Sequence, residues 1–294
     1  MLKLTRRRFG QLLIGSTAVA GLGYLSTKTS AQTSSAQNSS IIYGARLDRK
    51  AGGFVIQSLD LATKQIQDLT TVSTESDELL SSLSYVAAEN KFLLTFNPSS
   101  TSTRENLSPR LVSVVPGQAQ TSVFVSGVQK GQRLQSVLVT NDGSVVSLVQ
   151  KKDKTSSTLA NLDVKAAAIN TINNIVLAVT DRFDNLAQSR LENIVQSKGI
   201  IYTTSLGLQG DTSLVQLDLT KGQVSQGVQL KIDGTVWNSG FSSLASASGD
   251  QIYALGAPRY ITPYNLYSIN VSTGVITLIQ QWDVAKIATS AGTS

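Results

Sequence analysis

The chain contains no histidine and no cysteine. The absence of histidine removes the commonest general base and the commonest ligand of zinc, copper and haem iron. The absence of cysteine removes disulfides, thiolate catalysis and iron–sulfur clusters. Catalytic triads of the Ser-His-Asp and Cys-His types, and zinc hydrolases, therefore cannot be built from this chain alone.

Long apolar runs and excess charge are also scarce. No run of about 18 apolar residues occurs, so no membrane-spanning helix is expected in the mature protein. The formal net charge is +6, but five of the 25 basic residues and none of the 19 acidic residues lie in residues 1–31, so the remainder carries only +1. This balance does not favour a nucleic-acid partner.

The first 31 residues resemble a twin-arginine export signal. The residues that carry the resemblance are Arg6, Arg7 and Phe9. The next two residues, Gly and Gln, stand where the usual motif has Leu and Lys. A mildly apolar stretch follows over residues 12–25, and the small residues at 29–31 predict cleavage after Ala31.

This resemblance implies that the twin-arginine translocase is a partner during export and that the mature protein is periplasmic or secreted. An ordinary secretory signal, or an uncleaved amphipathic anchor, would explain the same residues. Residues 32–40 form a polar linker of low complexity. Residues 41–294 are expected to form one domain.

The rest of the chain consists of short β-patterned runs separated by Gly, Asn, Asp, Ser and Pro. One repeated unit has an apolar strand, a tight turn and a second strand, and begins at Leu80, Leu134, Leu191 and Phe241. A second unit has centres 53, 50, 55 and 52 residues apart, at Asp60, Ser113, Asp163, Asp218 and Asn270. Four strands in each repeat of about 50 residues are typical of propeller blades.

The first repeat lacks its opening strand, because residues 41–45 match the second strand of the unit. Residues 284–290 match the missing strand. We therefore predict an all-β fold, a five-bladed β-propeller of four-stranded antiparallel blades, whose ring is closed by pairing the C-terminal strand with the N-terminal blade. The expected blades are 284–290 with 41–71, then 79–127, 133–178, 190–231 and 240–282. An open two-sheet sandwich is the alternative.

The Leu-Asp-Leu sequence followed by a turn and a glycine, with Gly117, Gly222 and Gly274 in equivalent turns, resembles the YVTN and quinoprotein-like propellers. The resemblance covers about residues 41–290 and implies an architecture but no activity. In such a fold, the connections after the second and fourth strands of each blade emerge on one face. The longer loops of this chain fall there, so we call it the loop-rich face and expect any ligand site on it.

Arg133 and Arg190 precede the innermost strand in successive repeats, which predicts two arginines at the rim of the central channel. They could bind an anion or carboxylate, or could only pair with nearby acids. Trp237 and Trp282 could stack on a sugar or could fill gaps between blades. Further binding candidates on the loop-rich face are Arg182, Arg259 and Tyr260. Asp60, Asp163 and Asp218 are expected to cap turns.

The leading interpretation is an exported, monomeric, non-catalytic propeller that recognises a carbohydrate, peptide or small anion. A glycoside hydrolase or lyase is the alternative, because that chemistry needs only two carboxylates. Its candidate acids are Glu78, Asp181, Asp184 and Asp283. A structural part of a cell-envelope or extracellular assembly is a further interpretation. No cofactor and no metal site are expected, although scattered oxygens in the channel could hold calcium.

Overall fold

The computed structural model describes residues 41–99, 102, 108–151, 157–174, 176–177, 190–207, 210–225, 227–258 and 264–289. These residues belong to one compact unit, which spans Asn38–Ser294. None of the helical segments within these ranges has the length and apolarity needed to cross a membrane.

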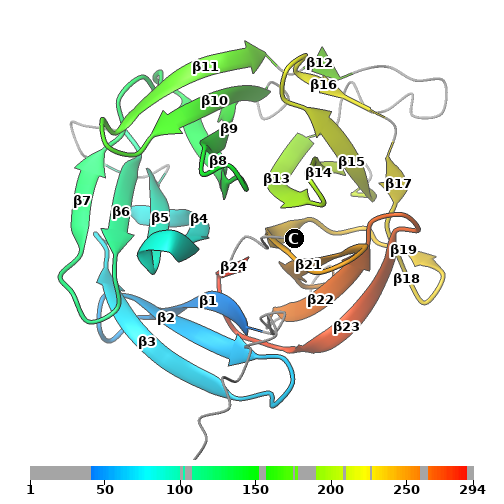
Figure 1. Ribbon diagram of the computed structural model, residues 1–294, viewed down its shortest axis with the longest axis horizontal. Helices are drawn as coiled ribbons and strands as arrows, with labels where there is room; N and C mark the ends of the chain where they lie inside the picture. The colour runs from blue at the N-terminus through cyan, green and yellow to red at the C-terminus, as the bar shows by residue number, and fades with distance from the viewer. Residues whose placement is uncertain are drawn as a thin grey trace, which may run out of the picture. The chain divides into compact units, whose positions relative to one another are not determined.

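Five sheets form the unit, each built on four antiparallel strands, and each sheet is one blade (Figure 1). Blade 1 contains β24 (Lys286–Thr289), β1 (Ile41–Asp48), β2 (Gly53–Asp60) and β3 (Ile66–Ser73). Blade 2 contains β4 (Glu78–Val86), β5 (Lys91–Pro98), β6 (Arg110–Val114) and β7 (Thr121–Phe124), with the 3-10 helix η1 (Ala87–Glu89) after β4. Blade 3 contains β8 (Gln132–Val139), β9 (Val145–Lys151), β10 (Ser157–Asp163) and β11 (Ala168–Asn174).

Blades 4 and 5 carry short additional strands. Blade 4 contains β13 (Arg190–Ser197), β14 (Ile200–Leu206), β15 (Thr212–Asp218) and β16 (Gln223–Val224), joined by β12 (Val176–Leu177) and β17 (Val228–Gln229). Blade 5 contains β20 (Phe241–Ser246), β21 (Gln251–Gly256), β22 (Asn265–Asn270) and β23 (Val275–Gln281), joined by β18 (Lys231–Ile232) and β19 (Thr235–Val236).

The first strand of each blade lines a central axis. These inner strands, β24, β4, β8, β13 and β20, contact one another in a closed ring. The ring closes because β24 pairs antiparallel with β1, from Ile42 opposite Thr289 to Ala45 opposite Lys286. The predicted five-bladed propeller and its shared first blade are thus confirmed, and the two-sheet sandwich is wrong.

Neighbouring inner strands contact one another without a backbone ladder in the described residues, and side chains join them instead. The hydroxyl of Ser82 accepts a hydrogen bond from Val137 N (3.1 Å) and donates to Val137 O (3.2 Å). Ser243 does the same with the N and O of Ile287, at 3.2 and 3.1 Å. We call these contacts latches. They pair backbone groups that would otherwise be buried without partners.

The two other latches use single hydrogen bonds. The hydroxyl of Ser136 accepts from Ile194 N at 3.2 Å, and Asn193 Nδ2 donates to Phe241 O at 2.8 Å. Latches therefore link β4 to β8, β8 to β13, β13 to β20 and β20 to β24. They join four of the five interfaces between neighbouring inner strands, and the β24–β4 interface has no such latch among the described residues.

The apolar core is divided into five clusters, one between each pair of neighbouring blades. Middle strands are buried on both faces for this reason: in β5, Phe92, Leu94 and Phe96 pack toward blade 1, whereas Leu93 packs toward blade 3. Period-two alternation of apolar and polar residues is consequently weak in these strands.

Acidic or amide side chains cap the turns between the third and fourth strands. Asp60, Asp163, Asp218 and Asn270 each accept hydrogen bonds from the two backbone N–H groups that lie two and three residues further along. These bonds from Lys221 and Thr220 hold the pKa of Asp218 below its usual value. The structure therefore shows turn caps here, and not a carboxylate site.

We expect Ser243→Ala to destabilise the fold by about 2 kcal/mol, because it leaves the buried N–H and C=O of Ile287 unpaired. Urea unfolding of the variant and the parent protein measures this difference. Ser272→Ala, on an exposed turn, serves as the control and should change the free energy of unfolding by less than about 0.5 kcal/mol. Equal stability of the two variants would show that the latch does not hold β24 in place.

Candidate functional site

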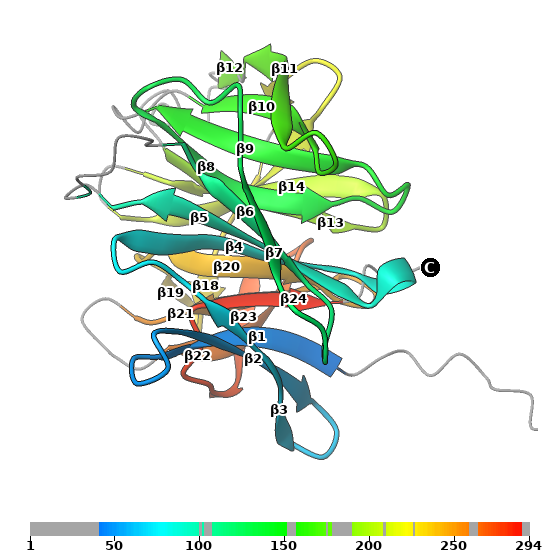
Figure 2. The ribbon, with the colours of Figure 1, turned by 90° about the vertical axis from the view of Figure 1, so that its left-hand side faces the viewer.

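Each inner strand of blades 2 to 5 contains a β-bulge near its start. The register shifts lie between Leu80 and Ser82, Leu134 and Ser136, Leu191 and Ile194, and Phe241 and Ser243. A bulge leaves one extra residue on its strand and changes where side chains point. All four bulges lie near the start of their inner strands, the end away from η1, which follows β4 and is the short coiled ribbon in Figure 2. They form one level of the ring, which we call the channel mouth.

Two of the bulge residues have a purely structural role. Ser81 donates its hydroxyl to Thr95 O at 3.0 Å, and Ser242 donates to Leu255 O at 3.2 Å. In each case the acceptor belongs to the neighbouring second strand, opposite the bulge. The equivalent residue of blade 4 is Glu192, which cannot donate in its charged form. Blade 3 has Gln135 at this position, so Glu192 of blade 4 is the one acidic residue among the four bulge residues.

Glu192 is 6% exposed, and its carboxylate makes few polar contacts. One oxygen, Oε1, accepts a hydrogen bond from Arg190 Nη2, two residues earlier on the same strand. The other oxygen, Oε2, is buried without a hydrogen-bond partner within the described part of the chain. Gly240 makes room for it, since a Cβ atom there would lie 2.5 Å from Oε2. Burying a carboxylate oxygen that accepts no hydrogen bond raises the free energy of the folded state unless another donor pairs with it.

Lys286, on the inner strand β24, places a positive charge near the Glu192 carboxylate. It occupies the latch position of β24, where the other blades have Ser or Asn, and its Nζ donates to Ser242 O. Burial lowers the pKa of Lys286 to about 8, and the nearby Glu192 carboxylate opposes that shift. The ammonium is therefore mostly protonated at neutral pH, at the expense of desolvation.

Arg133 holds the same place on β8 as Arg190 on β13, one residue before the conserved apolar position of each repeat. It lies opposite Gln150, whose Nε2 donates to Leu191 O at 3.5 Å and so links blades 3 and 4. Arg133 is partly exposed and takes part in no ion pair within the described ranges. Among the described residues of the inner strands, the channel mouth carries the cations Arg133, Arg190 and Lys286 and the buried acid Glu192.

The partner of Arg190 was not predicted. Arg190 pairs with Glu192, an acid that the sequence analysis did not single out. Residues i and i+2 of a strand lie on the same side, which brings these two side chains together. Glu192 and Lys286 could have been found by comparing the repeats. Blades 2, 3 and 5 begin their inner strands with LSSL, LQSV and FSSL, whereas blade 4 has LENI, with Glu192, and blade 1 has VAKI, with Lys286.

The tryptophans fill gaps between blades. Trp237 and Trp282 are each 3% exposed. Trp237 stacks on Phe241 between blades 4 and 5, with ring centroids 5.1 Å apart. Trp282 packs between blades 5 and 1 and against Gly44, where a Cβ atom would lie 2.7 Å from its ring. Neither indole is available as a stacking platform, so the structural interpretation applies to both.

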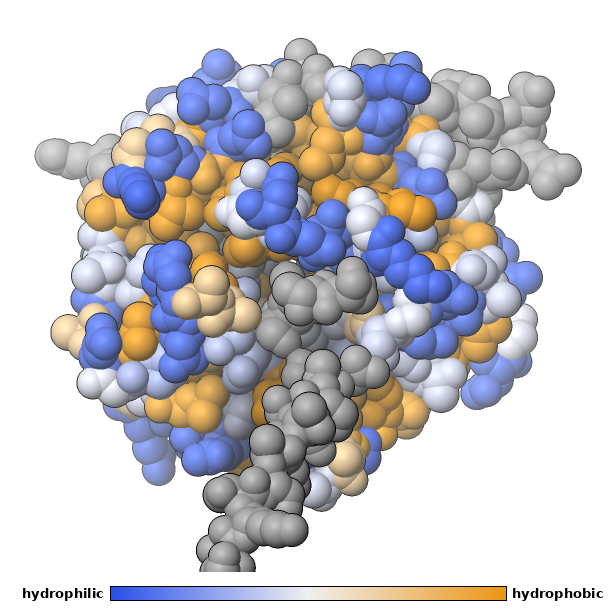
Figure 3. All heavy atoms as spheres, viewed as in Figure 1, coloured by the Kyte–Doolittle hydropathy of each residue, from blue (hydrophilic) through white to orange (hydrophobic). Residues whose placement is uncertain are grey.

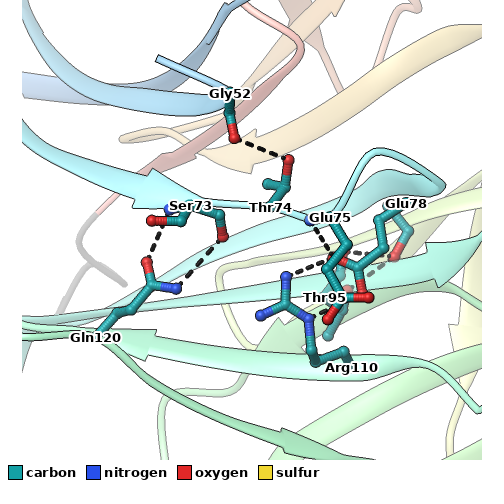
Figure 4. Close-up of polar contacts among 9 residues, drawn as sticks. Gly52, Ser73, Thr74, Glu75, Glu78, Thr95, Arg110 and Gln120 are labelled. Atoms are coloured by element: carbon teal, nitrogen blue, oxygen red, sulfur yellow. Dashed lines mark hydrogen bonds and ion pairs between the residues drawn. The ribbon is translucent and has the colours of Figure 1, made fainter.

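The candidate acid Glu78 is engaged in a buried ion pair. Arg110 Nε donates to Glu78 Oε1 at 2.8 Å and Arg110 Nη2 donates to Oε2, while the backbone N–H of Glu75 also reaches Oε2 at 3.3 Å (Figure 4). The carboxylate raises the pKa of Arg110, and both side chains are at most 7% exposed. A general acid or nucleophile needs a carboxyl group that a substrate can reach, and this one is enclosed.

Several predicted residues lie outside the described ranges. These are the signal residues Arg6, Arg7, Phe9 and Ala31, the binding candidates Arg182, Arg259 and Tyr260, and the acids Asp181 and Asp184. Asp283, the remaining candidate acid, is exposed between β23 and β24. No cluster of three or more acidic residues suited to a metal ion occurs in the part of the chain that the structure places.

Below the mouth the channel is nearly filled. A cavity of about 40 Å³ lies among the ends of all five inner strands, lined mainly by aliphatic residues such as Leu83, Val137 and Ile287. Its lining contains hydroxyl groups but no carboxylate. Calcium prefers several carboxylate and carbonyl oxygens, so this part of the channel does not fit the calcium site considered from the sequence.

A wider groove of about 640 Å³ lies between blades 3 and 4 on the opposite face. Its floor contains Ile200, Ile201 and Leu217, and its rim contains Asn141 and Asp142. Figure 3 views this face and shows apolar surface among polar residues near the top. Gln196 of blade 4 lines this groove, whereas the equivalent residue of blade 2, Tyr85, packs on Tyr43 and Phe92.

No family model and no curated protein sequence matches this chain. Among solved structures, TolB from Acinetobacter baumannii is 14% identical, with a TM-score of 0.47, over 84% of this chain and 54% of its own. The chain thus spans about half of TolB. The periplasmic gluconolactonase of Pseudomonas aeruginosa is 10% identical, with a TM-score of 0.45, over 83% and 82%.

An exo-β-1,3-galactanase of Phanerochaete chrysosporium is 9% identical, with a TM-score of 0.48, over 73% of this chain and 50% of its own. Similarities this low carry no argument about ligand or activity. The propeller fold of this chain rests on the strand pairing described above.

We expect Lys286→Met to remove a pH-dependent part of the stability. Because the folded pKa is below the unfolded value, the unfolded chain binds more protons between pH 8 and 10.5, and stability rises with pH across that window. The variant should lose this rise, about 2 kcal/mol after allowance for partial exposure. Chemical unfolding from pH 7 to 10.5 measures it. Lys221→Met, on an exposed turn, is the control and should run parallel to the parent protein.

We expect Glu78→Gln to cost about 3 kcal/mol of stability, because Arg110 would remain buried without its counter-charge. The double variant Glu78→Leu with Arg110→Met should recover part of that loss. Asp250→Asn breaks the exposed pair with Lys198 and should cost less than about 1 kcal/mol. Full stability of Glu78→Gln in thermal unfolding would contradict a structural role for this ion pair.

Proposed function

We propose that this protein is an exported, non-catalytic binding propeller whose channel mouth binds a carboxylate-bearing ligand. The observation that supports the proposal is the arrangement at the channel mouth: Arg190 pairs with the buried carboxylate of Glu192, Lys286 lies near that carboxylate, and Arg133 holds the place on β8 that Arg190 holds on β13. These residues come from three inner strands of the ring, so the propeller scaffold fixes their separation. A rigid scaffold lowers the entropy lost when a ligand is bound.

Charge favours an anionic ligand. With Lys286 protonated, the three cations exceed the one anion by two charges. Each guanidinium presents paired donors that match a carboxylate, whereas an ammonium acts as a point charge. Glu192 acts as a positioning residue in this arrangement, because its Oε1 holds Arg190 in place. Of the ligands expected from the sequence, the mouth therefore favours acidic sugars, peptide carboxylates and small organic acids.

The pKa of Lys286 links binding to pH. An anion beside the ammonium favours its charged form, so binding should take up a proton near pH 8. Affinity should then fall as the pH rises through the folded pKa of Lys286. This dependence separates Lys286 from the two arginines, which stay charged throughout.

The N-terminal segment supports the proposed place of action. The twin-arginine resemblance of residues 1–31 supports export of the folded chain to the periplasm or the exterior. A fold without cysteine suits that route, because it needs no oxidative folding outside the cytoplasm.

We expect Arg133→Gln and Arg190→Gln each to weaken carboxylate binding about tenfold, the loss of one charge-assisted contact. Isothermal titration calorimetry at low salt measures this with citrate, oligogalacturonate and an acidic peptide, each beside its uncharged counterpart. Arg46→Gln is the control, because Arg46 lies on β1 and pairs with Asp68 at 3.6 Å. Absence of binding by all three acids, or equal losses in all three variants, would contradict the proposal.

A further inference from the structure

Within the described residues, two arginines each pair with a glutamate whose side chain is buried, and the two pairs are bonded differently. In the pair of Arg110 and Glu78, Nε and Nη2 of the guanidinium each donate to one carboxylate oxygen, so both oxygens are paired (Figure 4). In the pair of Arg190 and Glu192, only Nη2 donates, to Oε1. Arg190 Nε and Glu192 Oε2 are both buried without a hydrogen-bond partner in the described part of the chain.

The two unpaired atoms of the second pair belong to one position. Nε and Nη2 of a guanidinium donate along the same edge, as the contact of Arg110 with Glu78 shows. Arg190 Nε therefore donates along the edge at which Nη2 meets Glu192, where Oε2 has no donor. We call this position the open fork. It offers one donor and one acceptor, and it lacks a group that accepts from the first and donates to the second.

Few chemical groups fit both atoms of the open fork. A hydroxyl can accept from Nε and donate to Oε2 at the same time, whereas a carboxylate only accepts and an ammonium only donates. Charge also disfavours an ammonium, because Arg190 is positive and the charge of Lys286 acts on the same carboxylate. The open fork therefore fits a hydroxyl, which a ligand or a water molecule can supply.

The open fork lies where the channel mouth meets the interior. The side chains of Arg190 and Glu192 are 34% and 7% exposed, whereas those of Arg110 and Glu78 are 7% and 0% exposed. The fully bonded pair is thus sealed from solvent, and the other pair is open to solvent on its arginine side. Gly240 adds no side chain beside Oε2, where a Cβ atom would lie 2.5 Å away.

We propose that the open fork binds a hydroxyl group of the ligand, so that the channel mouth selects hydroxy acids over other carboxylates. This inference rests on the proposed function and narrows it. The ligand carboxylate contacts the cations of the mouth, and a hydroxyl beside it bridges Arg190 Nε and Glu192 Oε2. Sugar acids and small hydroxy acids carry both groups, whereas a peptide carboxylate has only an N–H donor beside it. Glu192 thereby determines specificity as well as the position of Arg190.

Three four-carbon acids test this inference, because they differ only at carbon 2. Succinate has hydrogen there, malate a hydroxyl and aspartate an ammonium. Isothermal titration calorimetry at low salt measures their affinities for the full chain. We expect one enantiomer of malate to bind about tenfold more tightly than succinate, the effect of one charge-assisted hydrogen bond, and aspartate to bind no more tightly than succinate.

The outcomes separate this inference from the proposed function. Equal binding of succinate and both enantiomers of malate would overturn the inference and assign the open fork to water, but it would leave carboxylate binding at the mouth intact. Tighter binding of aspartate than of malate would overturn it as well. Failure of all three acids to bind would contradict the proposed function itself.

Glu192→Gln supplies the matched variant, because its amide nitrogen donates at the open fork and cannot accept. The readout is the ratio of malate to succinate affinity, since loss of the negative charge changes the binding of every anion. The ratio should fall from about ten to about one. Gly240→Ala, which changes no charge, should also lower it, because its Cβ atom crowds Oε2.

Glu89→Gln is the control, because it removes an exposed acid that pairs with Lys91 after β4. This variant should keep the ratio of the parent protein. The parental ratio in both Glu192→Gln and Gly240→Ala would overturn the inference.

Discussion

The pairing of β24 with β1 is the contact on which the rest of the structure depends. Four residue pairs at the two ends of the described chain turn five sheets into a ring. Each core cluster lies between two blades, so a blade without its neighbour would leave half of a cluster in water. Closure thus buries apolar surface at every interface around the ring, and the latches then pair backbone groups that the inner strands leave open.

The channel mouth arises from the same repeated design. Bulges recur on four inner strands, and Ser81 and Ser242 use them to pair a carbonyl group on the next strand. Where Glu192 and Lys286 replace small polar residues, the structure instead contains a buried carboxylate with a spare oxygen and an ammonium with a lowered pKa. The buried ammonium of Lys286 loses part of its hydration, which is why its pKa falls.

The length of the connection that leads into a blade determines whether a segment of it covers the outer strand of that blade. A connection with residues to spare runs along the next outer strand, as at β12 and β18, whereas one of four residues can only reach the next inner strand. The short connection that brings β24 into the ring is therefore also the reason why no segment of it covers β3. Inner closure and outer exposure are two results of one short segment, residues 282–285.

The sequence alone determined the architecture, because spacing, turn residues and the displaced first strand are local patterns that repeat. The turn caps at Asp60, Asp163 and Asp218 could be predicted for the same reason. The channel mouth could be predicted only in part: the repeat placed Arg133 and Arg190, but it could not show that Glu192, Ser242 and Lys286 meet across the axis. Those contacts join residues of different blades, and the burial of Trp237 and Trp282 also depends on how neighbouring blades pack. Only the tertiary structure decides such contacts, because their energies depend on distance and desolvation and not on position along the chain.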